Sequence, residues 1–421
     1  MLKNLKHKVM DTEEKKRLAV NIVSLGVLQV ANYILPLLTI PYLVRILGPE
    51  YFGLLAFATA TIMYFTMITD YGFNLSATRQ ISIIRDDKDK VTEIFSAVMM
   101  IKTALMVVSF GLMALLVFSF EKFSQHWEVY FVTFGIVIGQ VLFPVWLFQG
   151  MERMKYITYL NIGSKAFFTV CVFIFVQEQA DYLLVPLITS MGFIVAAVCS
   201  LYLVKKEFDV SFKWQTSVTL KFQLLEGWHV FFSTMAISLY TISATFILGL
   251  FTNNTVVGYF AAADKLVQAV KGLYAPVSQA IYPLIGNKIN EDKQTGLVFI
   301  KKITRIVGAG MFVVSVMLFV LADPIVNLML GQQYQQSVLL LQIMAFLPWI
   351  IALNNIYGIQ TMLNLGYKQA FSYILVAAAI LGVGLSLIFV PIYEGLGTAI
   401  TILLVEIFVT VVMYLYLRNI K

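Results

Sequence analysis

Residues 94–119, with the sequence IFSAVMMIKTALMVVSFGLMALLVFS, decide the fold class of this chain. The stretch is 26 residues long and carries a single charge, on Lys102. A helix needs about 20 mostly apolar residues to cross the hydrocarbon layer of a bilayer. A helix that is apolar on every side must be buried, either in a large core or in a membrane. We therefore expect residues 94–119 to form a membrane-spanning helix.

The whole chain has the same character. Its 421 residues are 60% apolar and 13% charged, with a mean hydropathy of +0.84. Soluble domains are about 45–50% apolar and about 25% charged, so a soluble multidomain enzyme is excluded. We predict an all-α membrane protein with twelve transmembrane helices. The apolar stretches that predict them are 18–44, 52–69, 94–119, 129–149, 156–176, 183–204, 227–250, 256–285, 306–322, 338–363, 371–390 and 396–417.

Lysine and arginine are distributed unevenly between the two sides of these predicted helices. The segments on the side of the N-terminus hold 24 of the 30 basic residues, whereas the opposite segments hold two, Arg45 and Lys122. Basic loops face the cytoplasm, so we expect both termini there. This bias also accounts for the net charge of +7, because the basic residues lie near anionic headgroups. A nucleic-acid partner is not expected, since no basic stripe lies on a soluble module.

The chain divides into two halves of six predicted helices each. A shift of 205 residues places Tyr51–Ala58 on Val256–Ala263, which suggests an internal repeat. Because six is even, the halves share one orientation and are related by a pseudo-twofold axis along the membrane normal. Repeats of this kind place a substrate site between the halves. We expect a cytoplasmic N-terminal segment over 1–17, a six-helix bundle over 18–204, a cytoplasmic linker over 205–226 and a second bundle over 227–421.

Charged residues inside the predicted helices are few, and each marks a pathway or a buried pair. Lys102 and Lys165 lie about 12–14 Å from a cytoplasmic helix end, at 1.5 Å per residue. Their stems can partly snorkel from that depth, so a cavity-lining role and a structural role both stay open. The six charged residues are Lys102, Lys165, Asp264, Lys265, Lys271 and Glu406.

The predicted helix over 256–285 has one continuous polar face. Lys271 is too deep in it to reach either interface, so we interpret Lys271 as a cavity-lining cation or as half of an internal ion pair. Glu406 is the candidate partner for such a pair. Asp264 lies about 10 Å from Lys271 along the axis, so Lys265 is the candidate that neutralises Asp264. The residues that recur on this face at helical spacing are Asp264, Gln268, Lys271, Ala275 and Gln279.

Two further predicted helices carry uncharged polar faces. Gln29 and Asn32 share one face of 18–44, and His229 precedes a row of hydroxyl side chains in 227–250. A polar face on a membrane helix lines water or protein, although Ser and Thr also mediate ordinary helix packing. We predict a cavity walled by the first, seventh and eighth helices. Its candidate substrate residues are Lys271, Lys102, Lys165, Lys265, Asp264, Gln268, Asn32, Gln29 and His229, with Asp264 and Glu406 as candidates for ion coupling.

Aromatic and amide side chains form another group with two interpretations. Trp146 and Trp349 lie near Gln149, Asn354, Asn355 and Gln360 in the sequence. Trp beside amides suits a sugar ring, which stacks an apolar face and presents hydroxyls at its edge. The alternative is that these side chains anchor the helices at the interface or pack in the core.

Several kinds of catalytic chemistry have no sequence support. The chain has no G-x-x-x-x-G-K-[ST] string, so we expect no P-loop ATPase. Its three histidines, His7, His126 and His229, are far apart and have no metal-ligand spacing. We therefore predict no catalytic residue, no metal site and no cofactor, and a protein that is not an enzyme.

Four strings carry a family resemblance, from about residue 20 to the C-terminus. They are PYLVRILGPEYFG at 41–53, DYGFNLSAT at 70–78, PVWLFQG at 144–150 and QAIYP at 279–283. In this order they resemble the O-antigen flippases, the Wzx-type polysaccharide transporters of the multidrug/oligosaccharidyl-lipid/polysaccharide exporter superfamily. No family motif assigns Lys271 or Lys102 to the substrate, so their roles rest on depth and helix face alone.

The resemblance implies a fold and a function. The two six-helix bundles would form a V around a central cavity that faces each side of the membrane in turn. The substrate would be an undecaprenyl-diphosphate-linked repeat unit of O-antigen or a similar polysaccharide, moved to the outer leaflet of the bacterial inner membrane during lipopolysaccharide biosynthesis. The implied partners are this lipid-linked oligosaccharide, membrane lipids, and the polymerase and chain-length regulator of the same pathway.

Three other classes stay open as alternatives. A drug or small-solute antiporter of the same superfamily usually has a carboxylate in its first helix, and residues 18–44 contain no Asp or Glu. A membrane repeat-unit polymerase usually carries its reacting groups on large outer loops, which are short here. A major-facilitator transporter would carry a G-x-x-x-D-[RK]-x-G-[RK] string after its second helix, and residues 70–93 differ from it.

Overall fold

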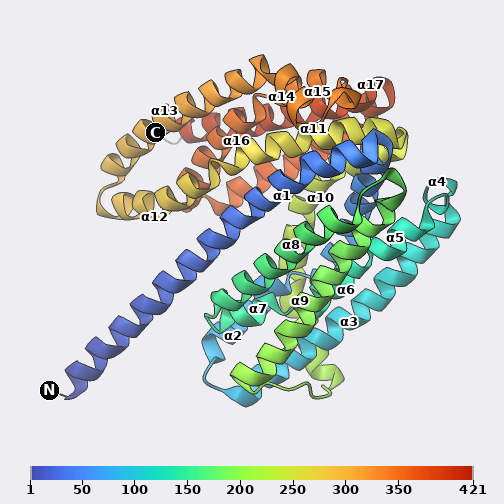
Figure 1. Cartoon of the computed structure of the whole chain (residues 1–421). Helices are drawn as coiled ribbons and strands as arrows, with labels where there is room; N and C mark the ends of the chain where they lie inside the picture. The colour runs from blue at the N-terminus through green and yellow to red at the C-terminus, as the bar shows by residue number, and fades with distance from the viewer. Residues whose placement is uncertain (1, 420–421) are drawn as a thin grey trace. The chain divides into compact units, whose positions relative to one another are not determined.

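The chain is almost entirely helical. The computed structural model describes residues 2–419, with side chains except those at 2–19, 22, 23, 25, 30, 33, 34, 229, 233, 234, 236–242 and 280. About 89% of the chain is helix, and the described residues contain no strand (Figure 1). Eight helical segments of the described part are long and apolar enough to cross a membrane. The expectation of an all-α membrane protein is confirmed, whereas the count of twelve crossings stays a prediction.

The helices pack into two compact units. The first unit comprises Met1–Thr39 and Thr61–Met235, and the second comprises Ile40–Ala60 and Ala236–Lys421. Residues 40–60, the tip of the first predicted helix pair, therefore pack with the C-terminal half of the chain. The predicted division at 205–226 has no direct test here and stays a prediction.

The first unit is built around a cluster of large buried side chains. Trp146, Phe148 and Phe73 are fully buried in it and come from two short helices that pack against each other. The helices with residues in this unit are α1 (Leu2–Asp70), α2 (Phe73–Ile84), α3 (Lys88–Ser119), α4 (Glu121–Ser124), α5 (Trp127–Thr133), α6 (Gly135–Leu142), α7 (Val145–Gly150), α8 (Met154–Phe175), η1 (Gln179–Leu183), α9 (Leu184–Phe208) and α10 (Ser217–Phe251).

The second unit contains two clusters of buried apolar side chains. Met362, Val405 and Met413 form one of its buried clusters, between α17 and a π-helical segment, and Ile285, Ala352 and Ile356 belong to another. It contains the end of α10 and, after it, α11 (Asn254–Gly272), α12 (Ala275–Glu291), α13 (Lys293–Val320), α14 (Ala322–Met329), η2 (Gln332–Tyr334), α15 (Ser337–Met344), α16 (Leu347–Asn355), η3 (Ile356–Leu363) and α17 (Lys368–Asn419).

Backbone breaks separate the predicted membrane stretches. Helix α1 covers the stretches 18–44 and 52–69 and breaks at Gly48, where φ is 69° and ψ is 174°. This left-handed region is open to glycine and strained for other residues. Helix α17 likewise covers 371–390 and 396–417, and its break lies at Glu394, with φ 51° and ψ −125°, shortly after Pro391. Both breaks lie where the sequence predicts a turn.

Three predicted stretches are not single α-helices. The stretch 129–149 consists of α5, α6 and α7, with the last break just before Pro144. The stretch 256–285 is split into α11 and α12, and 338–363 into α15, α16 and the π-helix η3. Proline lacks the N–H needed in a helix interior, and Pro144, Pro276 and Pro348 lie at or next to these breaks. Apolar composition alone does not reveal these breaks.

Two glycines bring helices of the second unit into backbone contact. A Cβ atom on Gly53 would lie 1.8 Å from the carbonyl oxygen of Asn254, and one on Gly258 would lie 1.9 Å from that of Pro49. The shift of 205 residues that relates the two predicted halves also relates Pro49 to Asn254 and Gly53 to Gly258. The contact is therefore reciprocal. Gly53 contacts Asn254, which is the repeat equivalent of Pro49, and Gly258 contacts Pro49 itself.

Candidate functional site

The second unit encloses a cavity of about 300 Å³ that is lined by both polar and apolar side chains. Its walls come from the last turns of α10, from α11, from α16 and from both arms of α17. The charged and polar residues that line it are Ser243, Thr245, Asp264, Gln268, Lys271, Ser386, Thr401 and Glu406. Four of the sequence-derived candidates, Asp264, Gln268, Lys271 and Glu406, therefore meet in one place.

The two carboxylates of the cavity are each bonded to an amide side chain. Gln268 Nε2 donates to Asp264 Oδ2 at 2.6 Å, one helical turn away on α11. Asn354 Nδ2 of α16 donates to Glu406 Oε2 at 2.5 Å, and Asn354 Oδ1 accepts a bond from Thr410 Oγ1 at 2.5 Å. Charge-assisted bonds of this kind are stronger than neutral ones, so the two carboxylates are held in position.

Lys271 lies at the break between α11 and α12. It is half-buried in the last turn of α11, where a positive side chain is favoured by the helix dipole. The backbone N–H groups of Leu273 and Tyr274 then close two tight turns before Pro276. Because the helix ends here, the polar face predicted over 256–285 is interrupted. Asp264, Gln268 and Lys271 line the cavity, whereas Ala275 and Gln279 do not.

Lys265 directly follows Asp264 on the same helix. Its side chain is exposed, and it does not line the cavity, whereas its neighbour Asp264 does. Asp264 accepts a hydrogen bond from Gln268. The suggested neutralisation of Asp264 by Lys265 stays a prediction.

A buried amide cluster fixes the start of α12 against the π-helix. Asn355 Oδ1 accepts from Ser278 Oγ at 2.7 Å and from Tyr274 Oη at 3.2 Å. Gln360 Nε2 donates to the backbone oxygen of Ser278 at 2.8 Å, and Gln360 is 1% exposed. Because Asn354 and Asn355 are adjacent on α16, one amide bonds the cavity carboxylate Glu406 and the next bonds α12.

The first unit contains a second lysine of interest, Lys102. The sequence predicts this lysine as a candidate but does not predict its acidic partner. Lys102 Nζ lies 3.5 Å from Asp70 Oδ1, and Asn74 Nδ2 donates to the same oxygen at 2.8 Å. Lys102 is 3% exposed and lines a cavity of about 210 Å³. Asp70 is not among the sequence-derived candidates, because it falls in the segment predicted as a loop. Its position directly after the apolar stretch 52–69 is the signal that could have identified it.

Lys165 and Asn32 also meet in the first unit. Lys165 Nζ donates to Asn32 Oδ1 at 2.6 Å, and Lys165 lines a cavity of about 180 Å³. Asn161 and Phe193 line both this cavity and the one at Lys102, so the two cavities are neighbours. Gln29 is half-buried one helical turn before Asn32. The side chain of His229 lies outside the described residues.

The aromatic and amide group divides between two environments. Trp146 is fully buried and packs at 6.1 Å from Phe95, measured between ring centroids, so its environment is core. Trp349 makes an edge-to-face contact with Phe312 at 5.2 Å. Among the described residues, no group of three or more His, Cys, Asp or Glu side chains could hold a metal ion.

The sequence of this chain is similar to those of known proteins. The family described as "Polysaccharide biosynthesis protein" matches residues 18–288. A protein of Escherichia coli (strain K12) named "Putative O-antigen transporter" is 38% identical over 95% of this chain and 97% of its own length. A protein of the same name from Shigella dysenteriae is 28% identical over 93% of this chain and 98% of its own.

Solved structures show the same fold at low sequence identity. A multidrug resistance MATE family transporter of the MOP superfamily, in an inward-facing conformation, matches 95% of this chain and 97% of its own, with a TM-score of 0.74 and 14% identity. The lipid II flippase MurJ, in an inward closed conformation, matches 95% of this chain and 87% of its own, with a TM-score of 0.71 and 11% identity. At these identities the likeness concerns the fold alone. The extent of the family match, together with the 38% identity to a nearly full-length relative, shows that the chain belongs to the polysaccharide biosynthesis protein family.

Proposed function

We propose that this protein is a flippase for lipid-linked oligosaccharides. The observation that carries the proposal is the nearly full-length match, at 38% identity, to a relative named as an O-antigen transporter. The substrate is an undecaprenyl-diphosphate-linked repeat unit of O-antigen or a similar polysaccharide. The protein moves it from the cytoplasmic to the outer leaflet of the inner membrane and makes or breaks no covalent bond in it.

The architecture proposed for this function is finer than the fold described above. It comprises twelve transmembrane helices in two bundles of six, over 18–204 and 227–421, with both termini in the cytoplasm. The bundles are related by a pseudo-twofold axis and open alternately to the two sides. The reciprocal contact of Gly53 and Gly258 supports this symmetry, because equivalent residues meet each other across a twofold axis.

The cavity chemistry suits an anionic, hydroxyl-rich substrate. A diphosphate loses its hydration in a membrane and needs replacement partners. Lys271 supplies a cation, and Ser243, Ser386 and Thr401 supply hydroxyls. The side chain of Thr401 is buried, and its Oγ1 has no hydrogen-bond partner among the described atoms, so it is available to a ligand or to water. The isoprenoid tail stays in lipid throughout.

The carboxylates of the cavity provide a route for coupling. Two carboxylates and one lysine give the lining a formal charge of −1 when all three are ionised. Ionisable side chains inside a membrane protein commonly mark ion pathways and proton relays. Counter-flow of protons or ions through Asp264 or Glu406 would couple the transport cycle to a gradient.

A gradient experiment tests this coupling. We expect an imposed pH gradient to change the flipping rate in proteoliposomes. Glu406→Gln should remove that dependence, whereas Asn327→Asp, at a residue that does not line the cavity, should retain it. Flipping that is indifferent to imposed H⁺ and Na⁺ gradients in the unmodified protein would exclude ion coupling and leave substrate-driven exchange.

A leaflet assay in cells tests the function itself. Deletion of the gene is expected to accumulate complete repeat units on the cytoplasmic face and to abolish surface polysaccharide, both reversed by complementation. Unpolymerised repeat units on the outer face would instead indicate a polymerase-like role. Unchanged lipid-linked glycans would favour a small-solute antiporter. The fold shared with a MATE transporter suits that alternative equally well. The absence of a carboxylate from residues 18–44 argues against it.

A further inference from the structure

The segment between α9 and α10 is attached to the side of α3. Helix α9 ends at Phe208 and α10 begins at Ser217, and the residues between them have no regular structure. The backbone N–H of Lys213 donates to Ser96 Oγ at 3.0 Å, and that of Gln215 donates to Met100 Sδ at 3.4 Å. The segment predicted as a cytoplasmic linker is therefore fixed to a helix along part of its length.

These attachment points lie within the apolar part of α3. Ser96 and Met100 are the third and seventh residues of the stretch 94–119, so they lie about 3–9 Å beyond its start at 1.5 Å per residue. Irregular backbone at such a depth requires partners for its N–H groups, because lipid offers none. Ser96 and Met100 supply two of these partners.

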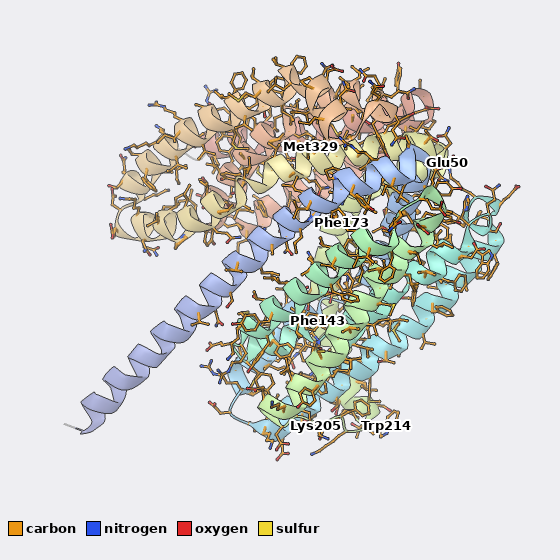
Figure 2. The ribbon with its side chains drawn as sticks, in the orientation of Figure 1. Glu50, Phe143, Phe173, Lys205, Trp214 and Met329 are labelled. Atoms are coloured by element: carbon orange, nitrogen blue, oxygen red, sulfur yellow. The ribbon has the colours of Figure 1, made fainter. Side chains whose placement is uncertain are left out.

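The segment exposes large apolar side chains rather than burying them. Trp214 is 83% exposed and Phe212 is 49% exposed, and their rings meet edge to face at 5.6 Å. Figure 2 labels Trp214 and Lys205 at the same end of the first unit. In the first turns of α10, Val218, Phe222 and Leu225 are also exposed and recur at i, i+4 and i+7, which is one helical face.

Two lysines beside these apolar groups form ion pairs within the protein, whereas Lys205 and Lys221 are exposed. Lys88 forms an ion pair with Asp209, and this contact holds the pKa of the Asp209 carboxyl below its usual range. Lys213 Nζ lies 3.9 Å from Asp89 Oδ1. Charged side chains next to exposed aromatic rings are typical of the headgroup level of a bilayer, where Trp is enriched.

We propose that residues 209–225 form an interfacial segment that inserts into the phospholipid headgroup layer, with Trp214 and Phe212 at the boundary to the acyl chains. Interfacial segments bury their apolar face about 5–10 Å into this boundary, which agrees with the depth of Ser96 and Met100. The occupant of this surface is bilayer phospholipid.

Brominated lipids test the depth of Trp214 in the full-length protein. The protein is reconstituted in phosphatidylcholine vesicles brominated at shallow or deep acyl positions, and tryptophan emission is compared between wild type and Trp214→Phe. We expect the component lost in Trp214→Phe to be quenched more by shallow than by deep bromine. Trp127→Phe, at the start of α5, serves as the matched control.

Two results would overturn the proposal. One is quenching of the Trp214 component by aqueous acrylamide and not by bromolipid, which would mean a water-exposed surface open to a soluble partner. The other is equal or stronger quenching by deep bromine.

A second pair of variants tests the attachment to α3. Ser96→Ala should reduce shallow-bromine quenching of Trp214 at least twofold, whereas Ser109→Ala on the same helix should leave it unchanged. Equal quenching in both variants would contradict the role of Ser96.

Discussion

At the residue scale, the account depends most on Lys271. This half-buried lysine lies in the last turn of α11, beside a cavity that also holds Asp264 and Glu406. We expect Lys271→Ala to reduce the flipping rate in proteoliposomes about 10–100-fold, because a bond to a charged group contributes about 1.5–3 kcal/mol. Lys271→Arg should retain more activity than Lys271→Ala. Lys265→Ala, on the exposed side of the same helix, is the control, and equal rates for Lys271→Ala and wild type would leave Lys271 without a role in transport.

The pair of Lys102 and Asp70 leads to a prediction about stability. Lys102 is almost fully buried, and its side chain depends on Asp70 at 3.5 Å. Removing one partner of a buried pair costs about 3–5 kcal/mol, and the low end applies here because Asp70 is partly exposed. Asp70→Ala should therefore lower the midpoint of thermal unfolding in detergent, and the added change Lys102→Met should restore most of the loss. A double variant no more stable than Asp70→Ala would contradict this pairing.

At the element scale, the crossing of Gly53 and Gly258 has no space for a side chain. A Cβ atom at either position would lie less than 2 Å from a backbone oxygen. Gly53→Ala and Gly258→Ala should therefore separate the two helices and lower the unfolding midpoint. Gly111→Ala and Gly310→Ala are matched controls, because nothing lies within 4 Å of a Cβ there. Ala is favoured over Gly in a helix by about 1 kcal/mol, so the controls should not be destabilised. Wild-type stability of Gly53→Ala would exclude the close contact.

Element boundaries show what a sequence of this kind can and cannot reveal. The breaks at Gly48 and Glu394 were predictable, because glycine and proline mark them between long apolar stretches. The break after Gly272 was not, since Pro276 also permits a bent continuous helix, and only the packing of Tyr274 and Ser278 against Asn355 selects two helices. The π-helix at 356–363 has no sequence marker of its own.

At the scale of the whole molecule, long-range pairing limits prediction of the site. Spacing on one helix correctly groups Asp264, Gln268 and Lys271, because helical periodicity is a local property. The amide partner of Glu406 and the acidic partner of Lys102 come from segments 52 and 32 residues away, which no local pattern connects. The assignment of residues 40–60 to the second unit likewise depends on tertiary packing.

The central claim is that this chain alone moves a lipid-linked oligosaccharide across a bilayer. The most direct measurement uses the purified full-length protein in liposomes that carry an undecaprenyl-diphosphate oligosaccharide, with an external glycosidase that reports on the outer leaflet. We predict that wild-type protein makes nearly all of the substrate accessible, whereas protein-free liposomes expose only the outer half and Lys271→Ala protein exposes the remainder about 10–100-fold more slowly than wild type. Accessibility that stays at the protein-free level with correctly folded wild-type protein would contradict the account.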